Sequence, residues 1–464
     1  MLIEQIYTGC LAQGAYYIES DGEAAVIDPL RESTPYISRA EKNGAKIKYI
    51  FETHFHADFV SGHIDLARKT GATIVFGPKA ETNYESYTAT DGEIFNMGKI
   101  KIKVLHTPGH TQESSTYLLI DENGKNHAIF SGDTLFIGDV GRPDLAVKSD
   151  LTKEDLAGML YESLQNKILL LEDNILVYPA HGAGSACGKK MSKETVDFLG
   201  IQKKTNYALL APDKATFIQQ VIDGIMPAPP YFPVNARMNK EGYDSYDSVM
   251  KKGTNPLTPA QFEEIVNSFS ALMLDSRHQK IFGKGFIPNS INISLDGQFA
   301  PWVGALIPDV SQPIVIISEE GKLEETLMRL TRVGYENVLG YLEGGIESWK
   351  SAGKEVDTIE TLTPDNLKTM LESDTKFNIL DVRRPSEFEV SHIPNSKNFP
   401  LDFINEKMSE IDKDTDYILY CSGGYRSMTT ASILRSRGFE NVRDVDGGFS
   451  SIVETGIKLA TNNQ

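Results

Sequence analysis

Residues 53–59 read Thr53-His54-Phe55-His56-Ala57-Asp58-Phe59, and the interpretation of the first half of the chain begins from this stretch. It alternates two imidazoles and a carboxylate with other side chains, and imidazoles and carboxylates bind transition metals. An apolar run at 47–51 precedes it and predicts a strand, and a helix is expected after it. The sequence therefore predicts a metal site just beyond a strand, where a sheet edge holds ligands rigidly.

Three further motifs place metal-binding side chains at turns after apolar strands. They supply His110 in Thr107-Pro-Gly-His-Thr111, Asp133 in Ser131-Gly-Asp-Thr134 and His181 in Pro179-Ala-His-Gly182. Up to about residue 190 the pattern is one of short alternating apolar strands with Gly/Asp-rich turns and a few helices. Besides the run at 47–51, strands are predicted at 15–18, 24–27 and 100–105.

Composition and charge are those of a soluble globular protein rather than a nucleic-acid-binding or membrane protein. With 464 residues, of which 40% are hydrophobic and 24% charged, two or three domains are expected. The net charge of −18 argues against nucleic acid as the main partner. No long apolar run occurs and no Lys or Arg precedes Arg31, so neither a membrane span nor a signal peptide is expected and we place the protein in the cytoplasm. Cys10, Cys187 and Cys421 are few and far apart, which favours reduced thiols over disulfides.

The second half of the chain repeats itself. A Pro-rich segment at 226–233 is expected to be extended and to close the first domain before a linker. After it, strand-like runs at 314–317 and 417–420 are each followed by a loop and a helical pattern, which predicts two βα-rich parallel-sheet domains. Several blocks recur in the same order: Leu274-Asp-Ser-Arg277 as Leu380-Asp-Val-Arg383, Ile287-Pro-Asn-Ser290 as Ile393-Pro-Asn-Ser396, and Gly334-Tyr-Glu-Asn-Val338 as Gly438-Phe-Glu-Asn-Val442.

Residues 1–250 resemble the metallo-β-lactamase superfamily, and within it most of all the persulfide dioxygenases. The resemblance implies a four-layered αβ/βα sandwich with a metal site at the sheet edges. It also implies one Fe(II), held by His54, His110 and Asp133. The blocks that carry the resemblance are Ala24-Ala-Val-Ile-Asp-Pro29, Thr53–Asp58, Ser61-Gly62, Thr107–Thr111, Gly132-Asp133, Gly141-Arg142 and Pro179–Gly182.

By the same resemblance, three further side chains surround the ligands and orient them together with a metal-bound water. They are His56, Asp58 and His181. Metal hydrolases with this motif usually carry a second histidine at position 59, where it helps to hold a second metal, and Phe59 cannot do so.

One metal is therefore expected. Two histidines and a carboxylate leave open positions for a persulfide sulfur and O₂, whereas Zn²⁺ has no accessible redox change. A hydrolase of the glyoxalase II type typically uses a second metal to hold and deprotonate water.

Two more residues near these motifs are candidates for substrate contact, each with a structural alternative. Cys187 lies in a Gly-rich stretch after His181 and is either a sulfur relay or a buried filler. Arg142 is either an anchor for an anionic thiol carrier or one partner of a structural salt bridge.

The stretch Cys421-Ser-Gly-Gly-Tyr-Arg426 lies between a predicted strand and a predicted helix. Its small residues let backbone N–H groups converge, and the helix N-terminus adds partial positive charge, so the loop favours a thiolate or a persulfide anion at Cys421. Arg426 can then steer sulfite or thiosulfate, with Ser422, Gly423, Gly424 and Tyr425 lining the site.

This stretch, with Asp381-Val-Arg383, Glu387 and His392, resembles the active loop of the rhodanese sulfurtransferases. That loop also has four residues between its cysteine and its arginine. The implied active rhodanese domain covers 360–464. The earlier repeat, 257–355, has Ser318-Glu-Glu-Gly-Lys322 in the loop position, without a cysteine or a matching arginine, and is expected to be an inactive rhodanese domain.

Bacterial sulfide-detoxification enzymes combine these domains, and the resemblance implies their chemistry. A low-molecular-weight thiol persulfide is oxidised by O₂ at Fe(II) to sulfite, and Cys421 passes sulfur to sulfite to give thiosulfate. The thiol (glutathione, coenzyme A or another) and the formation of a homo-oligomer are left open. Two alternatives remain: a glyoxalase II-like thioester hydrolase with an appended sulfurtransferase, and a non-catalytic sulfur carrier or persulfide sensor.

Overall fold

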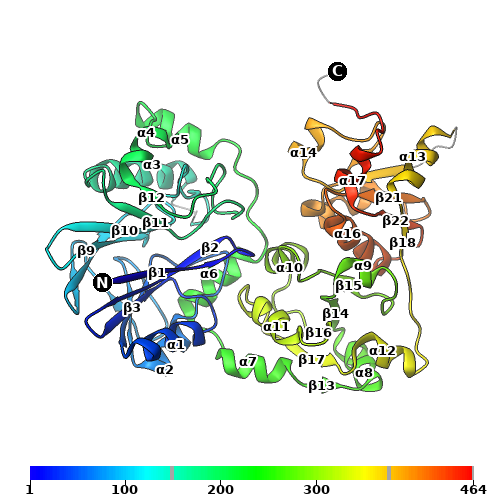
Figure 1. Ribbon diagram of the computed structural model, residues 1–464, viewed down its shortest axis with the longest axis horizontal. Coiled ribbons are helices and arrows are strands. Elements are labelled where there is room, and N and C mark those ends of the chain that lie inside the picture. The colour runs from blue at the N-terminus through cyan, green and yellow to red at the C-terminus, as the bar shows by residue number, and fades with distance from the viewer. Residues whose placement is uncertain (147–150, 374–377, 462–464) are drawn as a thin grey trace. The chain divides into compact units, whose positions relative to one another are not determined.

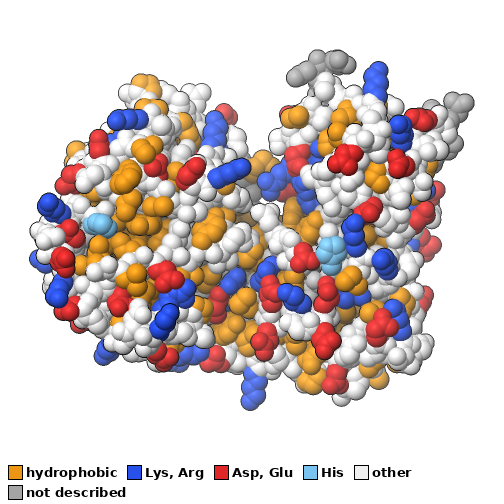
Figure 2. Space-filling view, in the orientation of Figure 1, with side chains coloured by type: hydrophobic (Ala, Val, Ile, Leu, Met, Phe, Trp, Pro, Cys, Tyr) orange, Lys and Arg blue, Asp and Glu red, His pale blue; other side chains and the backbone are white. Residues whose placement is uncertain are grey.

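Figure 1 shows a computed structural model of the protein, which describes residues 1–146, 151–373 and 378–461. The chain divides into two compact units. The first consists of Met1–Tyr246 with Thr331–Gly334, and the second of Asp247–Leu330 with Tyr335–Gln464. Among the described residues, none of the helices is long and apolar enough to cross a membrane. Figure 2 shows acidic and basic side chains interspersed over the viewed face, so the net charge of −18 is not gathered there in one patch.

Within the described ranges, the first unit contains two six-stranded mixed sheets, ordered β1-β2-β3-β4-β5-β6 and β12-β11-β10-β9-β8-β7. The strands of the first sheet are β1 (Leu2–Thr8), β2 (Gln13–Ser20), β3 (Glu23–Ile27), β4 (Lys46–Glu52), β5 (Thr73–Phe76) and β6 (Tyr87–Thr88). Those of the second are β7 (Ile94–Met97), β8 (Ile100–His106), β9 (Ser115–Ile120), β10 (Asn126–Gly132), β11 (Leu176–Pro179) and β12 (Asp197–Phe198).

Helices cover both outer faces of this pair of sheets (Figure 1). They are α1 (Thr34–Asn43), α2 (His63–Thr70), α3 (Lys153–Ser163), the π-helical turn Leu164–Ile168, α4 (Leu199–Thr205), α5 (Lys214–Ile222) and α6 (Phe232–Glu241).

Alternation of side chains along the strands builds the layers. In β2, Tyr16 and Ile18 point into the core between the two sheets, where Tyr117 and Phe130 of the second sheet meet them. Their neighbours Ala15 and Tyr17 point to the opposite face and pack in a core with residues of α1 and α2. A third core joins the outer face of the second sheet to α3 and α5. Because successive strand residues face opposite ways, each sheet buries both faces and the predicted αβ/βα sandwich is confirmed.

The predicted strands of the first unit are all present with small extensions at their ends. The runs at 15–18, 24–27, 47–51 and 100–105 fall within β2, β3, β4 and β8. The predicted metal-binding motifs directly follow β4, β8, β10 and β11. The side chains of these motifs therefore lie at one edge of the sandwich.

The Pro-rich segment ends earlier than predicted. It was expected to be extended through Pro233, but α6 begins at Phe232, with Pro233 in its first turn. A proline is tolerated there because the first N–H groups of a helix have no partner within the helix. The first compact unit continues past this segment to Tyr246.

The second unit contains the two repeats, and each forms a five-stranded parallel sheet within the described residues. The strand orders, β13-β17-β16-β14-β15 and β18-β22-β21-β19-β20, are the same when the repeats are superposed in chain order. This identity confirms the predicted internal repeat. The predicted strands at 314–317 and 417–420 coincide with β16 (Ile314–Ile317) and β21 (Tyr417–Tyr420).

The first repeat is preceded by α7 (Tyr246–Gly253). Its other elements are β13 (Pro256–Leu257), α8 (Pro259–Phe269), β14 (Leu272–Asp275), α9 (Gln279–Phe282), β15 (Ile291–Asn292), α10 (Phe299–Leu306), α11 (Leu323–Thr331), β17 (Val338–Leu342) and α12 (Gly345–Ser351).

The second repeat contains β18 (Glu360–Leu362), α13 (Pro364–Glu372), β19 (Asn378–Asp381), α14 (Pro385–Val390), β20 (Lys397–Asn398), α15 (Ile404–Lys407), α16 (Tyr425–Ser436), β22 (Val442–Val445) and α17 (Gly448–Glu454), with short 3₁₀ turns at Leu401–Phe403 and Met408–Glu410.

Candidate functional site

The three predicted iron ligands lie together in the first unit. One ligand atom from each of His54, His110 and Asp133 falls within 4.8 Å of the others, and all three side chains are buried. Asp133 Oδ2 lies 3.9 Å from His54 Nε2 and 3.4 Å from His110 Nε2. Neither carboxylate oxygen of Asp133 has a hydrogen-bond partner among the described residues. A buried carboxylate without partners is costly, so this cluster fits a bound cation.

Neighbouring groups fix which nitrogen of each histidine faces the cluster. Thr53 Oγ1 donates to Asp28 Oδ2 at 2.8 Å, so it accepts the Nδ1–H of His54 at 3.0 Å. His110 Nδ1 donates to the carbonyl of Arg142 at 2.8 Å. Both Nε2 atoms are left with their lone pairs toward Asp133, the tautomer a metal ligand requires. Burial, together with His56 and the other imidazoles, lowers the pKa of His54 well below its usual value and so favours this neutral form.

A second group of candidate ligands adjoins the first. His56, Asp58 and His181 also offer ligand atoms within 4.8 Å of one another. His181 Nε2 lies 3.4 Å from Asp58 Oδ2 and 3.6 Å from Asp133 Oδ1, so Asp133 stands between the two groups. These three residues therefore lie beside the first group, and together they form a potential second metal site. Their predicted role of orienting the ligands stays a prediction.

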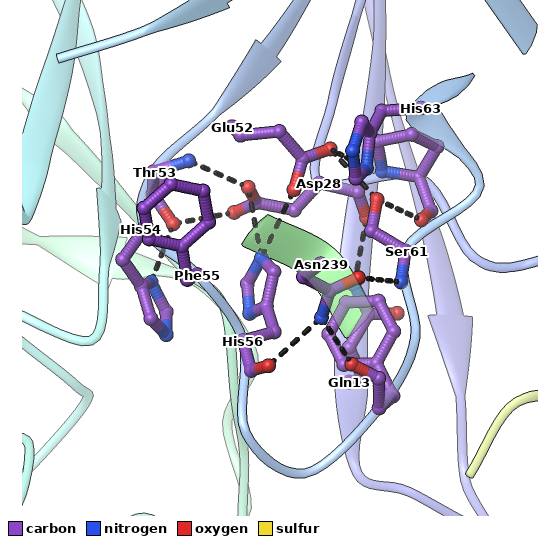
Figure 3. A network of polar contacts seen from close by, with 12 residues as sticks. Gln13, Asp28, Glu52, Thr53, His54, Phe55, His56, Ser61, His63 and Asn239 are labelled. Carbon is purple, nitrogen blue, oxygen red and sulfur yellow. Dashed lines mark hydrogen bonds and ion pairs between the residues drawn. The ribbon is translucent and has the colours of Figure 1, made fainter. Parts of the chain in front are cut away.

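His56 is held from behind by two buried carboxylates, as Figure 3 shows. Its Nε2 lies 3.1 Å from Asp28 Oδ1 and 3.7 Å from Glu52 Oε2, and its Nδ1 has no hydrogen-bond partner within the described part of the chain. Burial acts to lower the pKa of His56, but Asp28 and Glu52 raise it to about 9. Burial, and then the charge of Asp28, raises the pKa of Glu52 well above its usual value.

Phe59 is fully buried against His56. The two ring centroids are 4.3 Å apart with the planes inclined by 37°. Phe59 thus places a hydrocarbon surface beside the second group of candidate ligands, where a histidine would add a nitrogen.

Asn239 of α6 was missed by sequence reasoning although it supports the metal-binding loop. Its amide donates to the carbonyls of His56 and Phe59, both at 2.8 Å, and its oxygen accepts the N–H of Ser61 at 2.9 Å. Asn239 lies far from the motif in sequence and no local pattern marks it. Asp28 had a usable signal, because it follows a strand within a block that carries the family resemblance.

Gly141 is required by the closeness of the ligands. A Cβ atom at this position would lie 2.0 Å from the carbonyl oxygen of Asp133 and 3.1 Å from His110 Nδ1. Only glycine fits there, which gives the Gly141-Arg142 block a geometric role.

Arg142 is engaged in structural contacts. Its guanidinium pairs with both carboxylate oxygens of Asp144, at 2.6 and 2.7 Å, and also donates to the carbonyls of Ala186 and Met226. This is the salt bridge that the sequence left as the alternative. The side chain is 5% exposed, and its use as an anchor for a thiol carrier stays a prediction.

Cys187 is buried beside the metal-binding cluster. Its sulfur groups with Asp133 and His181 within 4.8 Å, and the residue is buried. Burial, and then the charges of Asp58 and Asp133, raises the pKa of the Cys187 thiol well above its usual value. Its role as a sulfur relay stays a prediction.

The stretch Cys421–Arg426, called the sulfur loop below, joins β21 to α16 and includes the first residues of that helix. The backbone N–H of Gly424 donates to Cys421 Sγ at 3.1 Å, and the hydroxyl of Ser427 lies 3.5 Å from the same sulfur. The backbone N–H of Phe449 holds the Cys421 carbonyl at 2.6 Å, and that of Ser450 holds the Ser422 carbonyl at 3.1 Å. Cys421 is 1% exposed and sits at the base of this loop, while Gly423 is exposed above it.

Arg426 is held by an acidic partner rather than standing free for substrate. Its guanidinium pairs with both oxygens of Glu387, at 2.7 and 2.9 Å, and donates to Ser422 Oγ at 2.9 Å. Partial burial acts to raise the pKa of Glu387, but Arg426 lowers it to about 2. The Tyr425 side chain is turned toward the first repeat and donates to the Ser294 carbonyl. Its predicted contact with substrate would therefore come from its backbone.

The first repeat has the same backbone arrangement but no cysteine at the position of Cys421. Ser318 follows β16 as Cys421 follows β21. Thr326 Oγ1 donates to the Lys322 carbonyl just as Thr430 Oγ1 donates to the Arg426 carbonyl, so Lys322 stands at the arginine position. Lys322 is paired with Glu325 at 2.9 Å.

Comparison with known proteins agrees with this architecture. The metallo-beta-lactamase superfamily matches residues 8–181, and the rhodanese-like domain matches residues 258–352 and 363–455. A metallo-beta-lactamase crystal structure from Staphylococcus aureus is 33% identical, with a TM-score of 0.65, over 74% of this chain and 98% of that one.

Two of the curated relatives cover about a third of this chain. The cytoplasmic hydroxyacylglutathione hydrolase of Arabidopsis thaliana is 33% identical over 177 residues, which are 37% of this chain and 65% of that protein. A probable hydroxyacylglutathione hydrolase of Schizosaccharomyces pombe is 32% identical over 34% of this chain and 58% of that protein. The chain thus spans less than two thirds of the length of these relatives. Taken together with the fold and the ligand cluster, these matches show that the chain belongs to the metallo-beta-lactamase superfamily and carries two rhodanese-like domains after its metallo-beta-lactamase domain.

Proposed function

We propose that the first unit is a persulfide dioxygenase with one Fe(II), and that the second unit transfers sulfur through Cys421. The overall oxidation is R–S–SH + O₂ + H₂O → R–SH + SO₃²⁻ + 2 H⁺. When bound by His54, His110 and Asp133, ferrous iron would supply the redox chemistry that O₂ requires and that Zn²⁺ lacks. The observation that carries the proposal is the presence on one chain of a buried two-histidine, one-carboxylate cluster and a sulfur-binding loop.

The protein's own residues orient the ligands and limit water. Thr53 and the Arg142 carbonyl hold the His54 and His110 rings so that both Nε2 atoms face Asp133. Phe59 covers one side of His56 with hydrocarbon and adds no ligand, which supports a single metal. Asn239 fixes the loop that carries His56 and Phe59 by donating hydrogen bonds to their backbone carbonyls.

Sulfur transfer at Cys421 is proposed in two balanced steps. First, R–S–S⁻ + Cys421–SH → R–SH + Cys421–S–S⁻. In this step the outer sulfur moves to Cys421, and the proton of the Cys421 thiol goes to the leaving thiolate. Then Cys421–S–S⁻ + SO₃²⁻ → Cys421–S⁻ + S₂O₃²⁻, in which sulfite attacks the outer sulfur and the S–S bond to Cys421 breaks. Gly424 N–H and Ser427 Oγ are placed to stabilise the sulfur of the departing thiolate. Carrying both sites on one chain raises the effective concentration of sulfite at Cys421.

A second candidate function is a dinuclear thioester hydrolase with an appended sulfurtransferase. The specific observation in its favour is the adjoining group of His56, Asp58 and His181, which could hold a second metal despite Phe59. The names of the curated relatives point the same way.

Product analysis of three proteins separates these functions. With glutathione persulfide and O₂, we expect the wild type to yield thiosulfate, Cys421→Ser to stop at sulfite, and His110→Ala to yield neither while remaining folded. Coenzyme A persulfide serves as the second substrate. Hydrolysis of a hydroxyacylglutathione thioester without oxygen uptake would favour the hydrolase. If neither variant altered any turnover of persulfide, the protein would be a carrier or sensor.

A further inference from the structure

The side chain of Tyr425 lies against the first repeat. Its hydroxyl donates to the Ser294 carbonyl at 2.9 Å, and burial raises the pKa of the phenol well above its usual value, so it remains a donor. Its ring lies on Gly297: a Cβ atom there would be 2.5 Å from Cε2 and 2.9 Å from Cδ2 and Cζ. The segment 294–297 of the first repeat thus forms a seat that accepts this ring only because residue 297 is glycine.

Tyr425 occupies a decisive position in the sulfur loop. The residue before it, Gly424, donates its N–H to Cys421 Sγ, and the residue after it, Arg426, pairs with Glu387. A displacement of the Tyr425 backbone is therefore expected to move both the amide that faces the sulfur and the arginine that Glu387 holds.

Further contacts from the first repeat hold the elements around this loop. The backbone N–H of Asn292 in β15 donates to Ser432 Oγ of α16 at 2.8 Å. Lys280 of α9 pairs with Asp446 at 2.6 Å, just before the turn whose Phe449 N–H binds the Cys421 carbonyl. These contacts explain why α16 is buried from Ser427 to Leu434 without an apolar stripe: it packs on its own sheet and on β15.

We infer that the first repeat, although it lacks a nucleophile, positions the sulfur loop of the second repeat by seating Tyr425 on Ser294 and Gly297. This inference rests on the proposed sulfur transfer at Cys421. It makes Tyr425 and Gly297 positioning residues, and it gives the inactive domain a function in the reaction of its neighbour.

The test uses the full-length chain and substitutions on both sides of the contact. Gly297→Ala pushes the ring out of its seat and should lower the kcat of sulfur transfer from thiosulfate to cyanide by about tenfold or more, because small misplacements of reacting groups cost large factors in rate. Tyr425→Phe keeps the ring and loses one hydrogen bond, so a fall of about threefold to tenfold is expected. In a Tyr425→Ala background, Gly297→Ala should cause no further loss.

The control is Tyr335→Phe, which removes a similar phenol-to-carbonyl hydrogen bond, to Ile307, inside the first repeat. It should lower the stability of the protein and leave the kcat of sulfur transfer unchanged. Oxygen uptake with a persulfide should be the same in all of these variants, because none of the substituted residues belongs to the first unit.

A second readout is independent of turnover. The rate at which iodoacetamide modifies Cys421, followed by peptide mass spectrometry at one pH, should change in Gly297→Ala and not in Tyr335→Phe. Folded Gly297→Ala and Tyr425→Phe proteins with wild-type kcat and wild-type alkylation would overturn the inference. If Gly297→Ala does not fold, Tyr425→Phe decides. A wild type without sulfur transfer, but with alkylation that responds to Gly297→Ala, would refute the proposed function and leave the positioning role standing.

Discussion

Replacing Glu387 by glutamine tests the best-defined charge pair in the sulfur loop. The carboxylate binds Arg426 through both oxygens and accepts from Ser422 Oγ at 2.9 Å. A fall of its pKa from 4.5 to about 2 corresponds to about 3 kcal/mol if solvent does not screen the pair. Because 33% of the Glu387 side chain is exposed, screening reduces this to about 1 kcal/mol.

The pH dependence has a definite sign. Since folding lowers the pKa of Glu387, its stabilising effect is complete above the unfolded value of 4.5 and is lost as the pH falls toward about 2. The wild type should therefore be more stable than Glu387→Gln at pH 7 by about 1 kcal/mol. The difference should shrink between about pH 4.5 and pH 2.

Alkylation of Cys421 at increasing urea concentrations measures this difference in stability locally, because Cys421 is buried in the folded domain and reacts when the domain unfolds. Glu389→Gln, on the same helix but exposed, is the matched control and should behave as wild type. Sulfur transfer should show a raised KM for thiosulfate in Glu387→Gln, because Arg426 loses the partner that fixes its direction. Equal urea midpoints for Glu387→Gln and Glu389→Gln at pH 7 would refute this reasoning.

Three further outcomes concern the first unit. Asn239→Ala leaves the carbonyls of His56 and Phe59 without their buried donor, so we expect a loss of about 2–3 kcal/mol in urea unfolding and reduced iron content; an unchanged midpoint would contradict this. Gly141→Ala puts a Cβ atom 2.0 Å from the Asp133 carbonyl oxygen, so we expect the variant to be insoluble or to lose iron. A soluble variant with full iron content would contradict this. Phe59→His should raise the metal bound per chain from one to two when zinc is supplied, as counted by mass spectrometry, and a count that stays at one would show that Phe59 does not limit the site.

Local pattern was enough to predict most of the fold and the candidate ligands that the fold brings together. Alternating apolar residues gave the strands, and the motifs after them gave His54, His110 and Asp133, because ligands at strand ends meet at one sheet edge. Recurring blocks predicted two domains with the same strand order.

Contacts between distant segments could not be predicted in this way. Asn239 of α6 contacts the metal-binding loop, and Tyr425 contacts Ser294 of the other repeat. In both cases the two partners lie far apart in the sequence, and no local pattern links them. The charge of Arg142 was visible in the sequence, but its pairing with Asp144 required coordinates. The segment before α6 was predicted to be extended too far because proline disfavours a helix interior but not its first turn.

The account depends most on one metal and on oxygen chemistry, and a single preparation tests both. Protein purified without air should contain one iron per chain, and on addition of glutathione persulfide it should consume one O₂ for each sulfite formed, with thiosulfate counted as sulfite trapped at Cys421. Two metal ions per chain with no persulfide-dependent oxygen uptake would contradict the account.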